Sequence, residues 1–281
     1  ISKESFFEGT KSWLDQLKIK ASIGQQGNDA IGNWAYIDLY SLSKANDTSM
    51  TPSFYCIGNE KITWETTTNF NAGIEGAFLD NRVRLTAEYY NRKTTDMLLS
   101  YPMALSTGFS GFNANVGDMR NTGFEFEVGV TPIRTSDFEW NVRWMGSTQK
   151  NKVLHLTAES PEILNGARII KEGYALNTFY FSKSAGIDPA TGAQLYWAYE
   201  KDDDGNMIKG SEYITSDYTA ANNSKYFMGS RIPDLYGSIA TDLSWKGFDL
   251  SVLATYSIGG KIYDSLYNGS MNNMYFNNAW H

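Results

Sequence analysis

The sequence predicts an all-β protein made of long antiparallel strands, and three observations support this prediction. Apolar and polar residues alternate over segments that are longer than ordinary strands, which is the period of a strand with two different faces. Short turns alternate with long connections along the chain. Aromatic residues make up 15% of the 281 residues, although the mean hydropathy is only −0.40. So many rings in a polar chain indicate a large surface that is only half buried.

The first long pair of segments lies between residues 62 and 92. Its apolar side chains occupy the even-numbered positions from Trp64 to Phe78, and a tight turn at 80–82 follows. The alternation then resumes to residue 92. One face of this pair is therefore apolar and the other polar, which predicts a long hairpin.

The same unit occurs twice more, at 124–145 with a turn at 132–137, and at 235–256 with a turn at 246–247. A single alternating segment covers 17–23 near the start of the chain. Together with shorter segments, these predict about eight to ten strands, which is enough for a small barrel.

The connections between these segments fall into two classes. The turns near residues 80, 134 and 246 are short. The long connections, rich in Gly, Asn, Ser and Thr, are 97–121, 150–175, 200–228 and 259 onward. Short turns on one side and long loops on the other are typical of outer-membrane barrels. A soluble all-β carbohydrate-binding or adhesin module is the alternative, but strands in soluble sandwiches are usually about 5–6 residues long and their loops are not sorted.

In the barrel interpretation the two faces of each strand meet different solvents. The side chains expected to face lipid are Trp64, Phe70, Ile74, Phe78, Val83, Leu85, Phe126, Val128, Val142, Leu250 and Val252. Those expected to face the lumen are Glu65, Asn69, Asn71, Glu75, Arg84, Glu88, Glu125, Glu127 and Arg143. Aromatic residues beside the short turns are expected to form a girdle at one rim. They are Phe78, Phe138, Trp245 and Phe248.

The two ends of the chain do not look like the ends of a closed barrel. A closed barrel pairs its last strand with its first, because lipid cannot satisfy an open edge. Here the chain ends in a loop-like stretch at 272–280 and begins at Ile1 without the features of a signal peptide. We therefore expect a barrel portion that continues beyond both ends.

Charge and metal-ligand counts argue against other classes of protein. The net charge is −7, and the longest basic run is the pair Arg92 and Lys93, which leaves no footprint for nucleic acid. Cys56 is the single cysteine, so no internal disulfide forms. His155 and His281 are too few and too far apart for a zinc site. No cofactor is expected.

Two groups of carboxylates are candidates for chemical sites. Glu125 and Glu127 share a face simply because of the alternation, so we expect a hydrated wall rather than a glycosidase pair, and no enzyme activity. The stretch 200–206 partly matches a calcium loop, with Glu200, Asp202 and Asp204 at ligand positions, but Ser211 replaces the bidentate Glu. A hairpin turn is the favoured interpretation, and calcium binding by Glu200–Asp204 stays open.

Several segments resemble the SusC/RagA family of TonB-dependent outer-membrane transporters. The matching segments, in family order, are 27–32 (GNDAIG), 62–71 (ITWETTTNFN), 88–98 (EYYNRKTTDML), 117–123 (GDMRNTG), 186–192 (GIDPATG), 229–237 (GSRIPDLYG) and 256–264 (YSIGGKIYD). The resemblance covers nearly the whole chain.

This resemblance implies a roughly 22-stranded antiparallel transmembrane β-barrel in the bacterial outer membrane, with short periplasmic turns and long extracellular loops. It also implies a plug domain, energy from the TonB–ExbB–ExbD complex and a SusD-like surface lipoprotein as a lid. Oligosaccharides or oligopeptides are the implied cargo. Residues 1–281 would be a C-terminal-half portion of one barrel domain, without the signal peptide, the plug or the last strands.

Aromatic residues in the polar loops are candidates for cargo contacts, because rings stack on sugars and peptide side chains. The candidates are Tyr101, Phe109, Phe112, Trp197 and Tyr199. Packing within the loops, or contact with the lid, is the alternative for each.

Overall fold

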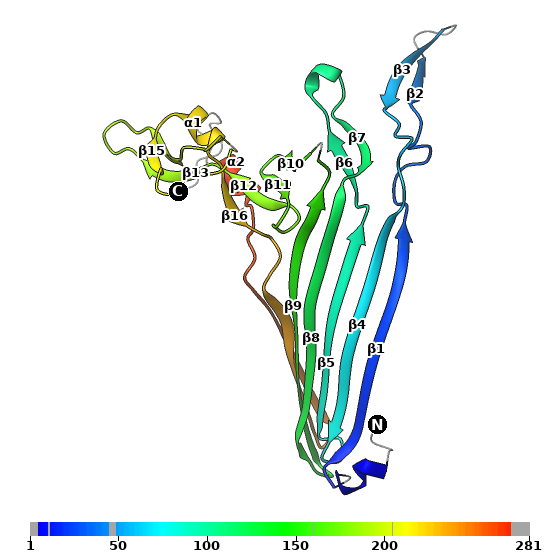
Figure 1. The fold of residues 1–281 in the computed structure, drawn as a ribbon. Coiled ribbons are helices and arrows are strands. Elements are labelled where there is room, and N and C mark those ends of the chain that lie inside the picture. The colour runs from blue at the N-terminus through cyan, green and yellow to red at the C-terminus, as the bar shows by residue number, and fades with distance from the viewer. Residues whose placement is uncertain (1–4, 11, 45–48, 159, 204, 271–281) are drawn as a thin grey trace.

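The main body of the protein is one antiparallel seven-stranded sheet, which we call the wall (Figure 1). The computed structural model describes residues 5–10, 12–44, 49–158, 160–203 and 205–270. In spatial order the wall strands are β1 (Leu14–Asn28), β4 (Glu65–Phe78), β5 (Val83–Thr95), β8 (Gly117–Arg134), β9 (Phe138–Leu156), β17 (Leu235–Trp245) and β18 (Phe248–Ile258). The all-β prediction and the three long hairpins are confirmed.

The registers keep the two faces of the wall separate from strand to strand. Paired residues of antiparallel strands project to the same face, so a row of pairs shows what each face carries. One row runs from Ile19 through Ile74, Ala87 and Phe126 to Gly146, and it is apolar. The neighbouring rows are polar. Alternation in the sequence therefore becomes one apolar and one polar face across the sheet.

The short turns lie together at one end of the wall. Leu79, Asp80 and Asn81 connect β4 to β5 with φ values of 57°, 56° and 59°, and the backbone N–H of Asn81 donates to Asp15 at 2.8 Å. Lys246 and Gly247 connect β17 to β18, also with positive φ, as the twist of a tight hairpin requires. The turn predicted at 132–137 is shorter, because β8 continues to Arg134.

The long connections all lie at the opposite end (Figure 1). They contain two projecting hairpins, β2 (Leu39–Lys44) with β3 (Met50–Cys56), and β6 (Leu98–Pro102) with β7 (Gly111–Asn115). The short helix η2 (Leu105–Thr107) lies between β6 and β7. The sorting of turns and loops to opposite ends is confirmed.

A larger excursion between β9 and β17 forms two small sheets and a helix. Its elements are β10 (Glu162–Asn165), β11 (Arg168–Lys171), β12 (Thr178–Phe181), β13 (Lys183–Ile187), β14 (Gln194–Ala198), β15 (Tyr213–Thr215), α1 (Tyr218–Asn223) and β16 (Tyr226–Gly229). The helices η1 (Ser5–Thr10) and α2 (Ser265–Ser270) flank the wall in sequence. No helix in the described ranges has the length and apolarity needed to cross a membrane.

The predicted boundaries need correction on the loop side. Strand β8 begins at Gly117 and β9 continues to Leu156, so the predicted connections 97–121 and 150–175 both include strand residues. The predicted connections 150–175 and 200–228 belong to one excursion, and the described wall has seven strands rather than eight to ten. The strands extend beyond the segments in which apolar and polar residues alternate, because backbone pairing continues where the side chains are already polar on both faces.

The buried core lies at the loop end of the wall. Its buried members are Met97, Val116, Val153, Leu156, Ile163 and Ile170. Met97 follows β5 and Val116 precedes β8, while the others lie at the end of β9 and in β10 and β11, so the core attaches the excursion to the wall. A sandwich would need a second sheet packed on the first. In the described residues no other sheet covers the wall, and the soluble sandwich alternative is not supported.

Candidate functional site

The polar face of the wall gathers the residues predicted to line a lumen. The registers place Glu65, Asn69, Asn71, Glu75, Arg84, Glu88, Glu125, Glu127 and Arg143 on this one face. The residues predicted to face lipid occupy the other face, from Phe70 on β4 to Val252 on β18. Trp64 precedes β4, and its ring lies over Gly27 on the apolar face.

A group of ion pairs crosses the first three wall strands on the polar face. Lys20 lies 2.9 Å from a carboxylate oxygen of Glu75 and 2.9 Å from one of Glu88, and Lys18 lies 3.3 Å from Glu75. Gly73 is paired with Lys20 on one side and with Glu88 on the other, and a Cβ there would approach the Lys20 Cε to 2.9 Å. The glycine therefore leaves the space through which the lysine reaches both partners.

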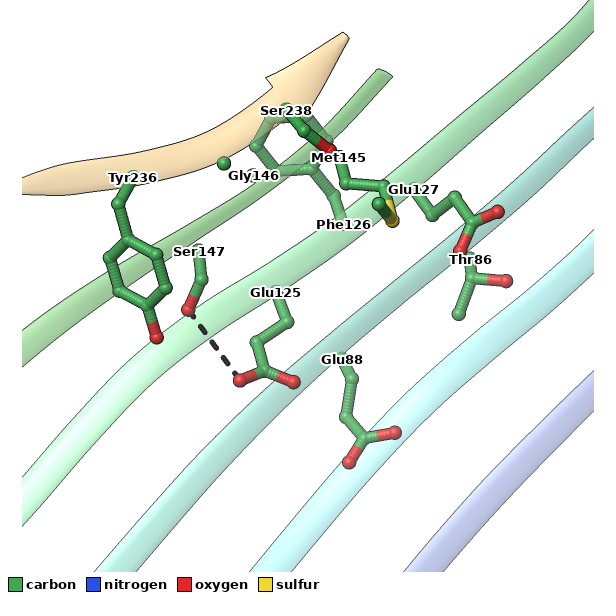
Figure 2. A pocket seen from close by; sticks show the side chains of 11 residues that line it. Thr86, Glu88, Glu125, Phe126, Glu127, Met145, Gly146, Ser147, Tyr236 and Ser238 are labelled. Carbon is green, nitrogen blue, oxygen red and sulfur yellow. Dashed lines mark hydrogen bonds between the residues drawn. The ribbon is translucent and has the colours of Figure 1, made fainter. Parts of the chain in front are cut away.

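Three carboxylates lie around a hollow of about 310 Å³ in the middle of the wall. Glu88 and Glu125 are directly paired, and Glu127 lies two residues further along β8. Figure 2 shows these side chains on the same side of neighbouring strands, with the Ser147 hydroxyl 3.5 Å from Glu125. Like charges opposite one another repel unless water or a cation screens them. The hollow is therefore suited to hydrated or cationic groups.

Two further hollows lie on the same face, and their chemistry differs. The one near the short turns, of about 370 Å³, is lined by charged residues of both signs, namely Arg82, Arg84, Arg134, Arg143, Glu127, Glu139 and Asp242. The one near the loops, of about 570 Å³, is lined by Gln26, Asn28, Glu65, Thr67, Asn69, Asn71 and Arg92. The polar face thus carries mixed charges near the turns, carboxylates in the middle and several amides near the loops.

The predicted loop aromatics lie in two separate places. Tyr101 and Phe112 pair across the β6–β7 hairpin with ring centroids 5.5 Å apart, and Tyr101 also packs against the buried core. Phe109 lies at the tip of this hairpin, and its ring centroid is 4.7 Å from the ring centroid of Phe54 on β3. The rings in β6–β7 therefore join the two projecting hairpins.

Trp197 and Tyr199 lie in the excursion instead. The Lys183 ammonium lies 5.3 Å from the centre of the Trp197 ring. Tyr199 is only 9% exposed, and its hydroxyl donates to the Lys225 carbonyl at 2.7 Å. This placement favours the packing alternative for Tyr199. No ring contact in the described residues joins these two side chains to the β6–β7 group.

Burial also changes the acidity of a tyrosine beside Tyr199. Tyr226 packs edge-on against Tyr199, with centroids 5.2 Å apart, and its hydroxyl donates to Glu212 at 3.0 Å. Burial, reinforced by the Glu212 carboxylate, raises the pKa of Tyr226 to about 12. This phenol stays protonated where an ordinary one ionises.

The stretch that partly matches a calcium loop forms a tight turn. The Asp202 carboxylate accepts a hydrogen bond from the backbone N–H of Asn206 at 2.7 Å, and Lys201 pairs with Met207. Asp204 lies outside the described residues. Among the described side chains no group of three or more His, Cys, Asp or Glu is arranged to hold a metal ion. The hydrogen bonds agree with the hairpin-turn interpretation.

The comparison with protein families decides where this chain belongs. Residues 12–280 match the family model described as "TonB dependent receptor-like, beta-barrel". The chain belongs to this TonB-dependent receptor family. It is a portion of an outer-membrane barrel wall, and both the antiparallel barrel fold and the outer-membrane location agree with the sequence predictions.

Relatives of the TonB-dependent receptor family align along almost the whole chain. TonB-dependent receptor P26 of Formosa agariphila is 29% identical over 99% of this chain, and TonB-dependent receptor SusC of Bacteroides thetaiotaomicron is 27% identical over 100% of it. The aligned parts are 28% and 29% of those receptors. The chain therefore spans little more than a quarter of the curated relatives it matches.

Solved structures of RagAB superpose on most of this chain. The RagAB peptide transporter structure gives a TM-score of 0.77 at 29% identity, covering 92% of this chain and 27% of the other. The RagAB peptide importer in its open-open state gives a TM-score of 0.75 at 28% identity, covering 90% and 27%.

Some polar-face residues of this TonB-dependent receptor segment were not among the sequence candidates. Lys18 and Lys20 alternate with Leu17 and Ile19, so the sequence predicts that both lysines lie on the polar face. Their partners on β4 and β5, however, depend on strand register. Tyr236 enters the acidic hollow from β17, far away in sequence. Register between distant strands is not encoded in local alternation, and this is why these contacts needed the structure.

Proposed function

We propose that residues 1–281 form part of the barrel wall of one TonB-dependent active importer of oligosaccharides or oligopeptides. In this proposal the polar face lines the lumen through which cargo passes, and the apolar face contacts the lipid bilayer. The whole segment belongs to a single barrel domain.

The observation that carries the proposal is the unbroken separation of the two faces across seven strands. A membrane barrel requires an apolar exterior and, in a transport protein, a hydrated interior. The same face carries three hollows lined by charged and amide groups, with hydrogen-bonding capacity for hydroxyl groups and peptide bonds. The similarity to SusC and to the RagAB peptide importer supports the same role.

The proposed partners follow from these relatives. A SusD-like surface lipoprotein would cover the loop end, where the β2–β3 and β6–β7 hairpins project. The TonB–ExbB–ExbD complex would supply energy through parts of the protein other than this wall. The half-buried loop aromatics Tyr101, Phe109, Phe112 and Trp197 are proposed cargo or lid contacts, while the buried Tyr199 contributes packing.

The test is uptake by cells that carry the complete protein. Labelled oligopeptides and oligosaccharides are supplied separately, and accumulation is measured with and without the TonB protein. We expect one cargo class to accumulate only when TonB and the proton-motive force are present. Accumulation that persists at the same rate without TonB, or no accumulation of either class, would count against the proposal.

A further inference from the structure

The apolar face of the wall is bounded on the loop side by basic residues, which we call the basic belt. The belt consists of Lys93 on β5, Arg120 on β8, and Lys150 and Lys152 on β9. Lys93 pairs with Arg120, and Arg120 pairs with Lys152, so three of the cations form one row across neighbouring strands. Lys150 pairs with Thr122, one row closer to the turns.

The strand registers place the belt on the apolar face. On β5, Lys93 continues the alternation that contains Ala87 and Tyr89, and these pair with Phe126 and Phe124. Side chains of paired residues share a face, so the belt belongs to the surface assigned to lipid in the proposed function. The present inference rests on that assignment.

Along the strands, the side chains on this face change in the order expected at a membrane boundary. The apolar rows give way to Tyr89 and Phe124, which are 43% and 45% exposed, and the cations follow. Lys93 lies about ten residues along β5 from Val83, a rise of about 25 Å at roughly 3.3 Å per residue and a tilt of about 40°. An apolar band of outer-membrane barrels is also about 25 Å tall. The belt therefore lies at headgroup level.

The charge of the belt is largely uncompensated. Lys93 lies 3.4 Å from a carboxylate oxygen of Asp118. Arg120, Lys150 and Lys152 are exposed and make no ion pair within the described residues. Neighbouring like charges repel across strands, and the chain as a whole carries a net charge of −7. Such a local excess of cations calls for an anionic partner.

We propose that the basic belt binds phosphate groups of anionic lipids in the outer leaflet of the membrane. Phosphate matches the forked guanidinium of Arg120 and the ammonium groups of the lysines. The acyl chains of the same lipid would lie along the apolar rows directly below, so one molecule would contact both zones. An acidic protein partner fits less well, because bilayer lipid already covers this face.

The experiment uses the complete protein, purified in detergent, and the triple variant Arg120→Gln, Lys150→Gln, Lys152→Gln. Binding of lipid A with two phosphates is compared with binding of its dephosphorylated form, at low ionic strength, by native mass spectrometry. Each cation near a charged lipid surface raises the binding constant about fivefold. We therefore expect the triple variant to bind the phosphorylated lipid about a hundredfold more weakly, and the dephosphorylated lipid unchanged.

The matched control is Lys61→Gln, Lys201→Gln, Lys209→Gln, which removes the same charge from exposed loop positions. We expect it to bind the lipid as the wild type does. Equal binding by the wild type and the belt variant would overturn the proposal. So would displacement of the lipid by an equal concentration of inorganic phosphate, or loss of an acidic protein partner with lipid binding retained. Cargo uptake, measured on the same variants, reports separately on the proposed import function.

Discussion

At single positions, contact between facing side chains decides which substitutions the wall tolerates. The ring of Tyr90 lies over Gly123 of the neighbouring strand, and its hydroxyl donates to the Thr148 carbonyl at 3.4 Å. A Cβ on Gly123 would clash with that carbonyl oxygen and with the Tyr90 hydroxyl. An aromatic ring covering a strand glycine in this way fixes the register as well as filling space.

We therefore expect Gly123→Ala to lower the free energy of unfolding by about 1–3 kcal/mol, because the strands must separate to admit the methyl group. Gly129→Ala is the matched control on the same face of β8, where the nearest atom to a new Cβ is 3.9 Å away. Denaturant unfolding of the complete protein in lipid vesicles measures both. Equal destabilisation by the two variants would argue against the packing of Tyr90 on Gly123.

A positive charge should lower stability on the apolar face and leave it almost unchanged on the polar face. Ile74→Arg puts a cation near the middle of the apolar band and should cost about 2–4 kcal/mol. Thr86→Arg puts the same cation between its paired neighbours Glu75 and Glu127 and should be close to neutral. Glu75 itself is a poor control, since replacing it would break its contacts with Lys18 and Lys20. If both arginines cost the same in a vesicle unfolding titration, the assignment of the faces is wrong.

At the level of elements, the buried core links the excursion to the wall. Ile163 and Leu164 are neighbours on β10, but Ile163 is 4% exposed and Leu164 is 47% exposed. Ile163→Ala should cost about 2–5 kcal/mol of local stability, because it leaves a cavity in the core, while Leu164→Ala should cost little. Limited proteolysis within residues 157–234 provides the measurement. Faster cleavage of both variants to the same degree would contradict the core described for this region.

The excursion should also respond to alkaline pH. The pKa of Tyr226 is about 12 in the folded protein, against an ordinary value near 10. Between those values the folded state holds a proton that the unfolded chain releases, so stability falls as pH rises from about 10 to about 12. Below pH 10 this group contributes no slope. In a spectrophotometric titration at alkaline pH, Tyr226→Phe should remove one late-ionising tyrosine; an unchanged late phase would contradict the burial of this phenol.

The elements show how far sequence alone could go. Alternation located the hairpins around the turns at 80, 134 and 246, because a strand between lipid and water has to show its two faces in its residues. The parts of the strands beyond the apolar band carry no such pattern. Alternation therefore does not predict that β8 begins at Gly117 or that β9 ends at Leu156. Strands β10, β11 and β15 of the excursion lie within segments that the sequence predicts as long connections, because these strands are too short to show an alternating pattern.

The site shows the same limit. Its face could be predicted residue by residue, but the contacts of Lys20, the approach of Tyr236 and the basic belt all depend on strand register. In the sequence, Lys93, Arg120 and Lys152 are far apart and the chain is acidic overall. Only the pairing of β5, β8 and β9 brings these cations into one row.

At the level of the whole molecule, two asymmetries define the segment. One separates the apolar and polar faces, and the other separates the short turns from the long loops (Figure 1). Together they orient the wall with respect to a bilayer: the turns at one surface, the loops and the excursion at the other, and the polar hollows on the side away from lipid. The proposed import function and the proposed lipid contacts both depend on the separation of the faces.

The most direct test of this account is site-directed spin labelling along residues 70–78 of β4. Single cysteines are introduced into a cysteine-free version of the complete protein in lipid vesicles, with Cys56 replaced by Ser, and nitroxide collisions with oxygen and with a water-soluble nickel chelate are measured. The account predicts that even positions such as Ile74 are accessible to oxygen, that odd positions such as Glu75 are accessible to the chelate, and that the two profiles alternate out of phase. Profiles without alternation, or with the opposite phase, would contradict it.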